Sequence, residues 1–169
     1  MLKLLITATI FITSIYSLSF TDIDGNSQSF GTYQGKKILL VNIATNADEV
    51  GQLTQLQQLH QQYQDSLVVI GFPSNSFNNE PRTNTEIKQF CQNNYGVTFK
   101  LAAKGNVTGA GMLPIYNWLA QQSENGVLNG TIVGDFQKFL IDKNGQIIGV
   151  FAPSVSPMDS TVIQAITEN

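Results

Sequence analysis

The fold is decided by residues 37–44, which read Lys-Ile-Leu-Leu-Val-Asn-Ile-Ala. This run is mostly apolar and does not alternate between polar and apolar side chains, as is typical of a strand buried on both faces. A second run of the same kind covers residues 67–72. Between the two runs, apolar residues recur every three or four positions, which predicts a helix over about residues 50–64 with one core-facing stripe.

The flanking segments extend this pattern. Residues 15–20 largely alternate, as a half-buried strand does, and Asp24-Gly25 predicts a hairpin that returns over residues 27–30. Further along, the patterns predict a helix from Thr83 to about Asn94, a strand over residues 97–102, a helix from Pro114, strands over residues 136–141 and 146–151, and a last helix after residues 156–159. Strands that alternate with helices predict an α/β domain with some parallel pairing. The expected architecture is a thioredoxin-like mixed sheet flanked by helices, with an N-terminal β-hairpin.

Composition excludes several classes of protein. The chain has 169 residues, enough for one domain with its own core. Its net charge is −3, which disfavours nucleic-acid binding because such proteins carry a basic patch. No apolar run reaches the roughly 18 residues that span a bilayer, so an integral membrane protein is not expected. One Cys and one His leave no internal disulfide and no multi-His metal site, so we expect no metal and no cofactor.

The amino terminus resembles a secretory signal peptide. Lys3 is followed by a mostly apolar stretch over residues 4–12, and although Thr13, Ser14 and Ser17 are small, no Ala-x-Ala cleavage site follows it. Residues 1–13 are therefore expected to be a signal peptide or an N-terminal extension, with the mature domain at residues 14–169 and cleavage between about Ser14 and Ser17. Export to the periplasm or the outside follows from this interpretation. An edge strand, an uncleaved anchor and a cytoplasmic location are the alternatives.

Short motifs spread from about Ser14 to Thr167 together resemble the glutathione peroxidase family. Each is a weak match alone, but they occur in the family's order. They are Ser14-Ile15-Tyr16, Asp22-Ile23-Asp24-Gly25, Tyr33-Gln34-Gly35-Lys36, Val41-Asn42-Ile43-Ala44, Gly71-Phe72-Pro73 with Asn75 and Phe77, Glu80-Pro81, Ile87-Lys88, Phe90-Cys91, Tyr95-Gly96-Val97-Thr98-Phe99, Pro114-Ile115-Tyr116 and Phe139-Leu140-Ile141-Asp142. The resemblance implies a glutathione-peroxidase-type thioredoxin fold and an ancestral reduction of hydroperoxides by a thiol or selenol.

The resemblance also implies where the catalytic groups would stand, and this chain departs from the family at each of them. The family's nucleophilic Cys or selenocysteine falls at Ala47, which has no nucleophile. The hydrogen-bond donors of the family, a loop Gln, a Trp and an Asn, fall at Ser76, Gly134 and Asp135. A carboxylate at position 135 would disfavour a neighbouring thiolate. No catalytic residue of the family is therefore intact.

Other residues of the site are kept. Asn75, Phe77 and Phe136 match the family and are expected to line a shallow polar pocket where Ala47, Ser76 and Asp135 converge. Such a pocket could bind a small polar ligand or a partner loop. Oligomeric state does not follow from the sequence.

The remaining reactive side chains have plainer interpretations. Cys91 falls where some thioredoxin-dependent relatives place a resolving cysteine, but a small buried side chain on the inner helix face is the expected role; a redox-active or intermolecular thiol is the alternative. His60 is expected to be half-buried and hydrogen-bonded rather than a catalytic base. Asp48 and Glu49 are expected to complement a helix dipole, with an acid/base pair as the alternative.

Two functions from different classes remain open. The first is a peroxidase homologue without peroxidase activity, which acts as a binding or interaction module or is a relic kept for its fold. The second is a thiol-dependent hydroperoxide reductase that works through Cys91 and would belong to the response to oxidative stress.

Overall fold

The computed structural model describes residues 12–168 and shows one mixed five-stranded sheet. Its central strand β3 (Lys37–Ile43) pairs in parallel with β4 (Leu67–Pro73) and antiparallel with β6 (Lys138–Ile141). The edges are β5 (Lys100–Leu101) beside β4 and β7 (Ile147–Phe151) beside β6. Every residue of β3 is buried, so the prediction from the apolar run is confirmed.

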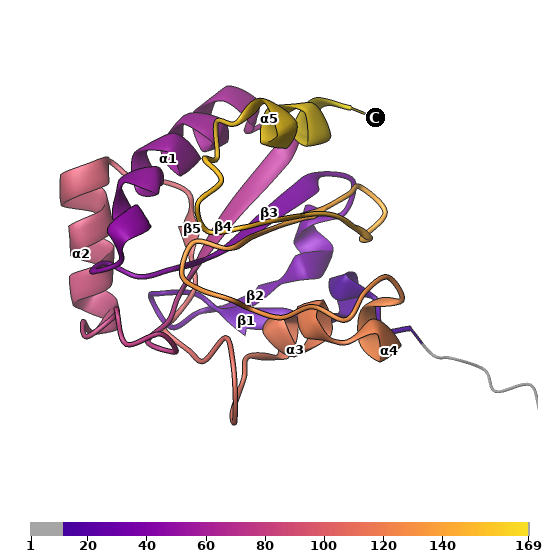
Figure 1. Ribbon diagram of the computed structural model, residues 1–169, viewed down its shortest axis with the longest axis horizontal. Coiled ribbons are helices and arrows are strands. Elements are labelled where there is room, and N and C mark those ends of the chain that lie inside the picture. Colours follow the sequence, from indigo (N-terminus) through magenta and orange to yellow (C-terminus); the bar gives the residue numbers. More distant parts are fainter. Residues whose placement is uncertain (1–11, 169) are drawn as a thin grey trace, which may run out of the picture.

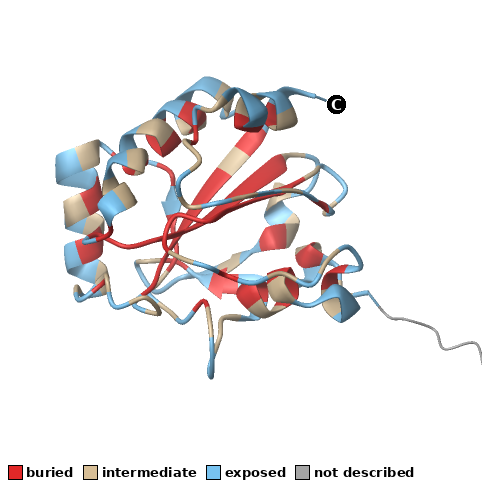
Figure 2. Cartoon of the chain, viewed as in Figure 1, coloured by how far each residue is buried: buried red, intermediate tan, exposed pale blue. Residues whose placement is uncertain are grey.

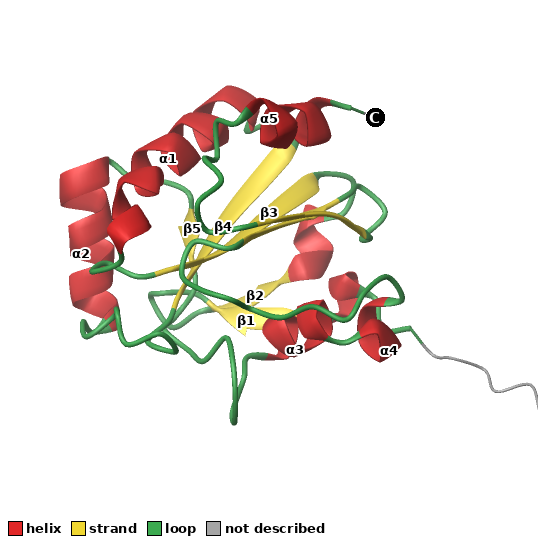
Figure 3. Ribbon diagram, viewed as in Figure 1, coloured by secondary structure: helices red, strands yellow, loops and turns green. Residues whose placement is uncertain are grey.

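Helices cover both faces of the sheet (Figures 1 and 3). On one face lie α1 (Gln52–Tyr63), α2 (Asn84–Tyr95) and α5 (Ser160–Thr167), and on the other lie α3 (Pro114–Ala120), α4 (Gln122–Asn125) and the hairpin of β1 (Ser19–Thr21) and β2 (Ser27–Ser29). Three short 3-10 helices, η1 (Ile15–Ser17), η2 (Phe30–Tyr33) and η3 (Asp48–Gly51), complete the described elements. The expected thioredoxin-like arrangement is confirmed.

The sheet divides the core into two apolar layers, and buried residues lie on the strands and on the helices of both faces (Figure 2). Alternate side chains of β3 point into each layer: Leu39 and Val41 pack with α1, α2 and α5, whereas Ile38 and Leu40 pack with α3 and the hairpin. This alternation follows from the two-residue repeat of a strand. Both layers are needed to bury β3, which is why its sequence is apolar throughout.

Two predicted strands are shorter than expected. Residues 15–17 form η1 because the Ser14 side chain accepts a hydrogen bond from Tyr16 N, and only residues 19–21 continue as β1. In the segment 97–102, Thr98 N donates to Gln57 Oε1 at 2.8 Å, and strand pairing is limited to β5. The Gln57 side chain of α1 thus replaces a neighbouring strand as the hydrogen-bond acceptor for Thr98 N.

The first described residues are part of the domain. Thr13 N donates to Glu124 O at 2.9 Å, and Trp118 Nε1 donates to Thr13 O at 2.7 Å. Ile15 is completely buried, so a mature chain that began at Ser17 would lose it from the core. The predictions for residues 1–11 lie outside the described residues. Within residues 12–168, none of the helices has the length and apolar character that crossing a bilayer requires.

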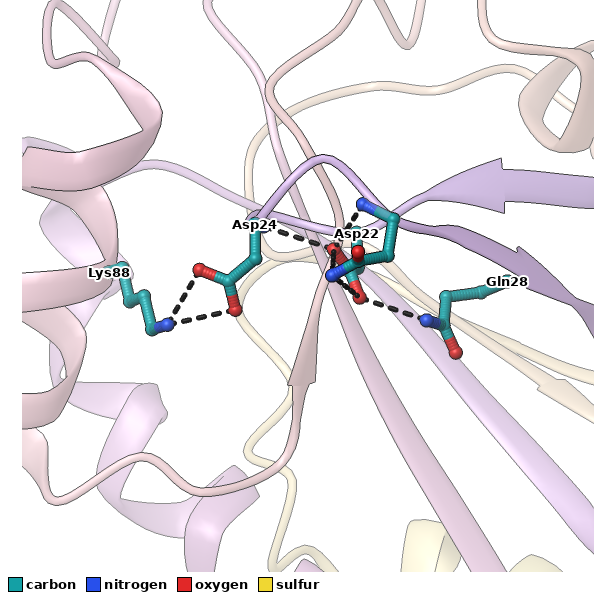
Figure 4. Close-up of polar contacts among 5 residues, drawn as sticks. Asp22, Asp24, Gln28 and Lys88 are labelled. Carbon is teal, nitrogen blue, oxygen red and sulfur yellow. Dashed lines mark hydrogen bonds and ion pairs between the residues drawn. The ribbon is translucent and has the colours of Figure 1, made fainter.

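The hairpin turn is tied to α2 by charged and polar contacts (Figure 4). Lys88 Nζ lies 2.6 and 2.8 Å from the two carboxylate oxygens of Asp24. Asp22 accepts hydrogen bonds from Asp24 N, Asn26 N and Gln28 Nε2 at 3.0, 2.9 and 2.9 Å. The capping box predicted at Thr83 and Glu86 starts α2, and Gly96 ends it in the left-handed conformation (φ 63°), so the helix is fixed at both ends and along its side.

Candidate functional site

The position that the resemblance assigns to the family nucleophile, Ala47, lies between the carboxyl end of β3 and η3. Ala47 is the residue before η3 and is 5% exposed, with its methyl group packed in the apolar layer beneath α1. Asp48 and Glu49 follow in the first turn, where carboxylates complement the exposed backbone N–H groups. The side chain at this position therefore offers a hydrocarbon surface and no reactive atom.

The loop after β4 is clamped onto the segment that precedes Ala47. Asn46 N donates to Asn79 O at 3.0 Å. The buried Glu80 carboxylate accepts from Thr45 N at 2.8 Å and from Thr45 Oγ1 at 2.7 Å. Arg82 Nη1 donates to Asn46 Oδ1 at 2.6 Å. These contacts hold the backbone around Ala47 in one place.

Asp135 is an acidic residue that contacts the loop after β4 through Asn79. It is 5% exposed; its Oδ2 accepts a hydrogen bond from Asn79 Nδ2 at 2.8 Å, and its Oδ1 has no partner within residues 12–168. Burial raises the pKa of the Asp135 carboxyl, and the charges of Glu49 and Glu80 raise it further, against the lowering effect of Asn79. The site therefore disfavours negative charge, which is the opposite of what a thiolate needs.

Gly134 and Phe136, the two neighbours of Asp135, are hydrogen-bonded to Asn42 of β3. Asn42 Nδ2 donates to Gly134 O at 2.7 Å, and Phe136 N donates to Asn42 O at 2.6 Å. Phe136 is buried with φ 62°, a conformation that is uncommon for a residue other than glycine. A Cβ added at Gly134 would lie 3.3 Å from Pro153 Cγ, so Pro153 closely borders the position to which the resemblance assigns the family's Trp.

The loop residues expected at the site have other roles. The Ser76 hydroxyl accepts from Val107 N at 3.0 Å and from Ser74 Oγ at 3.0 Å, which directs it to the 105–107 segment. Asn75 Oδ1 accepts from Glu80 N at 2.9 Å and braces the loop. Phe77 is half-buried against the apolar layer on the α3 face. Asn79 contacts Asp135 instead of Ser76, and nothing in the sequence pattern singles Asn79 out within its Asn-rich loop.

Lys138 is a second residue that the sequence pattern did not reveal. It is completely buried, and its Nζ donates to three backbone oxygens: Phe136 O at 2.7 Å, Pro153 O at 3.2 Å and Ala152 O at 3.4 Å. Burial lowers the pKa of Lys138 to about 8, with Glu49 acting in the opposite direction. The Lys138 ammonium group thereby links the residues just before β6, which include Asp135, to residues 152–153, which border Gly134.

Cys91 lies on the inner face of α2 and is 0% exposed. Burial raises the pKa of its thiol to about 12, so it stays protonated at neutral pH. The expected small buried side chain is what the structure shows. His60 is half-buried as expected, but its Nδ1 makes no hydrogen bond to the described residues, so the expectation of a hydrogen-bonded ring is wrong for that nitrogen. In the described part of the chain, no three His, Cys, Asp or Glu side chains gather into a group that could hold a metal ion.

Comparisons with solved structures and with sequence relatives identify proteins to which this chain is similar. The crystal structure of Trgpx in its apo form aligns with a TM-score of 0.67 at 29% identity, over 92% of this chain and 97% of that one. A glutathione peroxidase of Lactococcus lactis subsp. cremoris is 40% identical over 146 residues, covering 85% of this chain and 92% of the relative. A glutathione peroxidase-like peroxiredoxin of Schizosaccharomyces pombe is 40% identical over 144 residues, covering 84% and 90%.

The family assignment rests on most of the domain rather than on the site alone. The family model described as glutathione peroxidase matches residues 15–120, from η1 to the end of α3. The relatives above extend the similarity further along the chain. The chain belongs to the glutathione peroxidase family.

Proposed function

We propose that this chain is a glutathione peroxidase homologue that lacks peroxidase chemistry and uses the site around Ala47 for binding. The observation that carries this proposal is that the nucleophile position holds a buried methyl group, while the chain's one thiol, Cys91, is completely buried. Reduction of a hydroperoxide begins when a thiolate or selenolate attacks the O–O bond. Ala47 carries no sulfur or selenium atom from which either anion could form.

The surroundings of Ala47 support the same proposal. A low thiol pKa depends on hydrogen-bond donors and positive charge near sulfur. Here Asp48 and Glu49 follow Ala47 directly, the pKa of Asp135 is raised, and the Ser76 hydroxyl is engaged with Val107 and Ser74. A nucleophile placed at position 47 would therefore meet an environment that favours the protonated thiol.

A Cys91-dependent peroxidase is the second candidate. It is favoured by the relatives, among them proteins called glutathione peroxidase-like peroxiredoxins. The burial of Cys91 and the rise of its thiol pKa to about 12 count against it. Access of a hydroperoxide to this sulfur would require part of α2 to unfold.

A coupled assay separates the two candidates. The purified protein is mixed with hydrogen peroxide or cumene hydroperoxide, and NADPH consumption is followed with glutathione and glutathione reductase or with thioredoxin and thioredoxin reductase. We expect the rate of the blank, and no change in Cys91→Ala. The Lactococcus relative serves as the positive control for the assay. Turnover that disappears in Cys91→Ala would establish the second candidate and overturn the first.

Labelling of the native protein with iodoacetamide gives an independent measure of Cys91. We expect slow modification at pH 8, and rapid modification once the protein is unfolded in urea. Fast labelling of the folded protein would show that the thiol is reachable, as the second candidate requires.

We also propose that the domain is exported after removal of the amino-terminal segment. The charged start and the apolar residues 4–12 support this proposal. Amino-terminal sequencing of protein purified from its native host is the test, and an intact Met1 would contradict it.

A further inference from the structure

A pocket opens between the hairpin turn, α2 and the β5 edge of the sheet. Its volume is about 230 Å³, and it is lined by residues 22–24 of the hairpin turn, by Lys88 and Gln92 of α2, and by residues 97–101, which lead into β5. None of the residues described around Ala47 lines it. The pocket is therefore a second candidate site, separate from the one that follows β3.

The walls of this pocket are tied to one another by backbone hydrogen bonds. Ile23 N donates to Leu101 O at 2.9 Å, which joins the hairpin turn to β5. Val97 N donates to Cys91 O at 3.2 Å, which joins the segment before β5 to α2. Because the walls are fixed before a ligand arrives, binding costs little conformational entropy.

Both acidic side chains of the pocket already have partners (Figure 4). The Asp22 carboxylate accepts hydrogen bonds from two backbone N–H groups of the turn and from Gln28 Nε2. The two Asp24 oxygens lie 2.6 and 2.8 Å from Lys88 Nζ. The side chains of Lys88 and Asp24 are 35% and 53% exposed, and so exposed an ion pair is weak enough to open for a competing anion.

Two other lining side chains have polar groups that the described chain does not use. Lys100 is exposed, and within residues 12–168 its ammonium group forms no hydrogen bond or ion pair; its charge acts on Asp22 through space. Gln92 is exposed, and its amide makes no hydrogen bond to a described residue. The unused groups of the pocket therefore include a cation and an amide N–H, while its carboxylates are occupied.

We propose that this pocket binds a carboxylate between Lys100 and Lys88, with the Gln92 amide as a third donor. The ligand would take the place of Asp24 at Lys88 and would give Lys100 the hydrogen-bonded anion that it lacks. The apolar side chains of residues 97–101 border the same space, so a short alkyl group attached to the carboxylate fits there. The inference goes beyond the proposed function and does not depend on it.

The charges of the lining favour a singly charged ligand over a phosphate dianion. Asp22 and Asp24 offset Lys88 and Lys100, so the pocket has no excess of positive charge with which to hold two negative charges. A carboxylate brings one charge and accepts hydrogen bonds on both oxygens. Lysine ammonium groups bind as point charges on flexible stems, so they can meet the two oxygens from opposite walls.

The test is a titration of the full chain, labelled with ¹⁵N, followed by heteronuclear NMR. The free-acid probe is sodium butyrate, and the peptide probe is Nα-acetyl-alanyl-valine, which ends in a carboxylate as a protein chain does. Butyramide and the carboxamide form of the peptide are the neutral controls, and equimolar sodium chloride controls for ionic strength. We expect saturable shifts of the Asp24, Gln92 and Lys100 amides with the charged probes alone.

Two variants of the pocket should change the affinity in opposite directions. Lys100→Gln should weaken the charged probes about tenfold, the loss expected for one hydrogen bond to a charged group. Asp24→Asn removes the anion that competes for Lys88 and should tighten them about threefold. Lys143→Gln, at an exposed residue in the turn between β6 and β7, removes the same charge near the other edge of the sheet and should leave the affinity unchanged.

The two charged probes distinguish the sources of the carboxylate. Tighter binding of the peptide would identify the carboxyl end of a protein partner, and binding of butyrate at least as tight as that of the peptide would identify a small free acid. Shifts that do not saturate, equal binding of the neutral controls, or an unchanged affinity in Lys100→Gln would overturn the proposal. An affinity that does not rise in Asp24→Asn would overturn the part assigned to Lys88.

Discussion

Asp22 and Asp135 are equally buried carboxylates that the fold treats in opposite ways. Asp22, at the hairpin turn, is 6% exposed, and Asp135, beside Ala47, is 5% exposed. Asp22 accepts hydrogen bonds from the backbone N–H groups of Asp24 and Asn26 and from Gln28 (Figure 4). These contacts lower the pKa of Asp22, whereas burial and the charges of Glu49 and Glu80 raise the pKa of Asp135.

Burial by itself therefore does not set the charge of a carboxyl group; the number of donors around it does. Asp22 closes a turn and gains stability from being ionised. Asp135 accepts one hydrogen bond through Oδ2 and leaves Oδ1 without a partner in the described chain. A carboxylate with that surplus of acceptors destabilises the folded state when it is ionised.

The largest effect is expected from Asp22→Ala. The substitution leaves the N–H groups of Asp24 and Asn26 without their acceptor, and the loss of hydrogen bonds to a charged group should lower the free energy of unfolding by about 2–3 kcal/mol. Urea denaturation at pH 7 measures it. A loss below about 0.5 kcal/mol would show that water replaces the carboxylate at the turn.

Asp135→Asn should act in the other direction. The amide keeps an acceptor for Asn79 and removes a buried charge near Glu49 and Glu80, so we expect the free energy of unfolding at pH 7 to rise by about 1 kcal/mol. A decrease of that size would mean that the Asp135 charge is compensated after all.

The pH dependence of the same variant follows from linkage. The native pKa of Asp135 is raised above the ordinary value of 3.8, so its contribution to stability is fully present below 3.8 and is lost as the pH rises through the raised pKa. The advantage of Asp135→Asn should therefore grow as the pH increases and vanish near pH 4. Thermal unfolding of both proteins between pH 4 and pH 7 checks it; an advantage that is independent of pH would point to packing instead.

The smallest effect is expected at the ion pair of the hairpin. The side chains of Lys88 and Asp24 are 35% and 53% exposed, and a pair of this kind contributes about 0.5 kcal/mol. Lys88→Gln should lower stability by that amount at low salt and by less in 1 M sodium chloride. A salt-independent loss would indicate that the lysine stem stabilises α2 by packing rather than by charge.

The sequence was informative about the fold because its strongest signals are local. The apolar run that became β3, the capping box of α2 and the hairpin turns each depend on residues close together in the chain. Residues 15–17 were predicted as strand and form η1, because one side chain, Ser14, caps a turn there. Alternation over so few residues does not distinguish the two structures.

The site was less accessible to prediction, since its contacts join distant segments. The resemblance placed Ala47, Gly134 and Asp135 at the site, but the contact of Asn79 with Asp135 joins two loops and follows from the path of the loop after β4. The same path turns Ser76 toward Val107. The buried ammonium of Lys138 could not be predicted from a strand pattern either, because two of its three partners, Ala152 O and Pro153 O, lie in another segment.

The account rests on the claim that the surroundings of position 47 disfavour an anion. The most direct measurement is the thiolate absorbance at 240 nm as a function of pH for Ala47→Cys, with and without Asp135→Asn. Cys91 remains silent in this range because burial raises its thiol pKa to about 12. We predict a thiol pKa at position 47 above the ordinary value of about 8.5, a lower pKa when Asp135→Asn is added, and feeble peroxidase turnover in the single variant. A thiol pKa below about 7 in Ala47→Cys alone, near the value of activated cysteines, would contradict it.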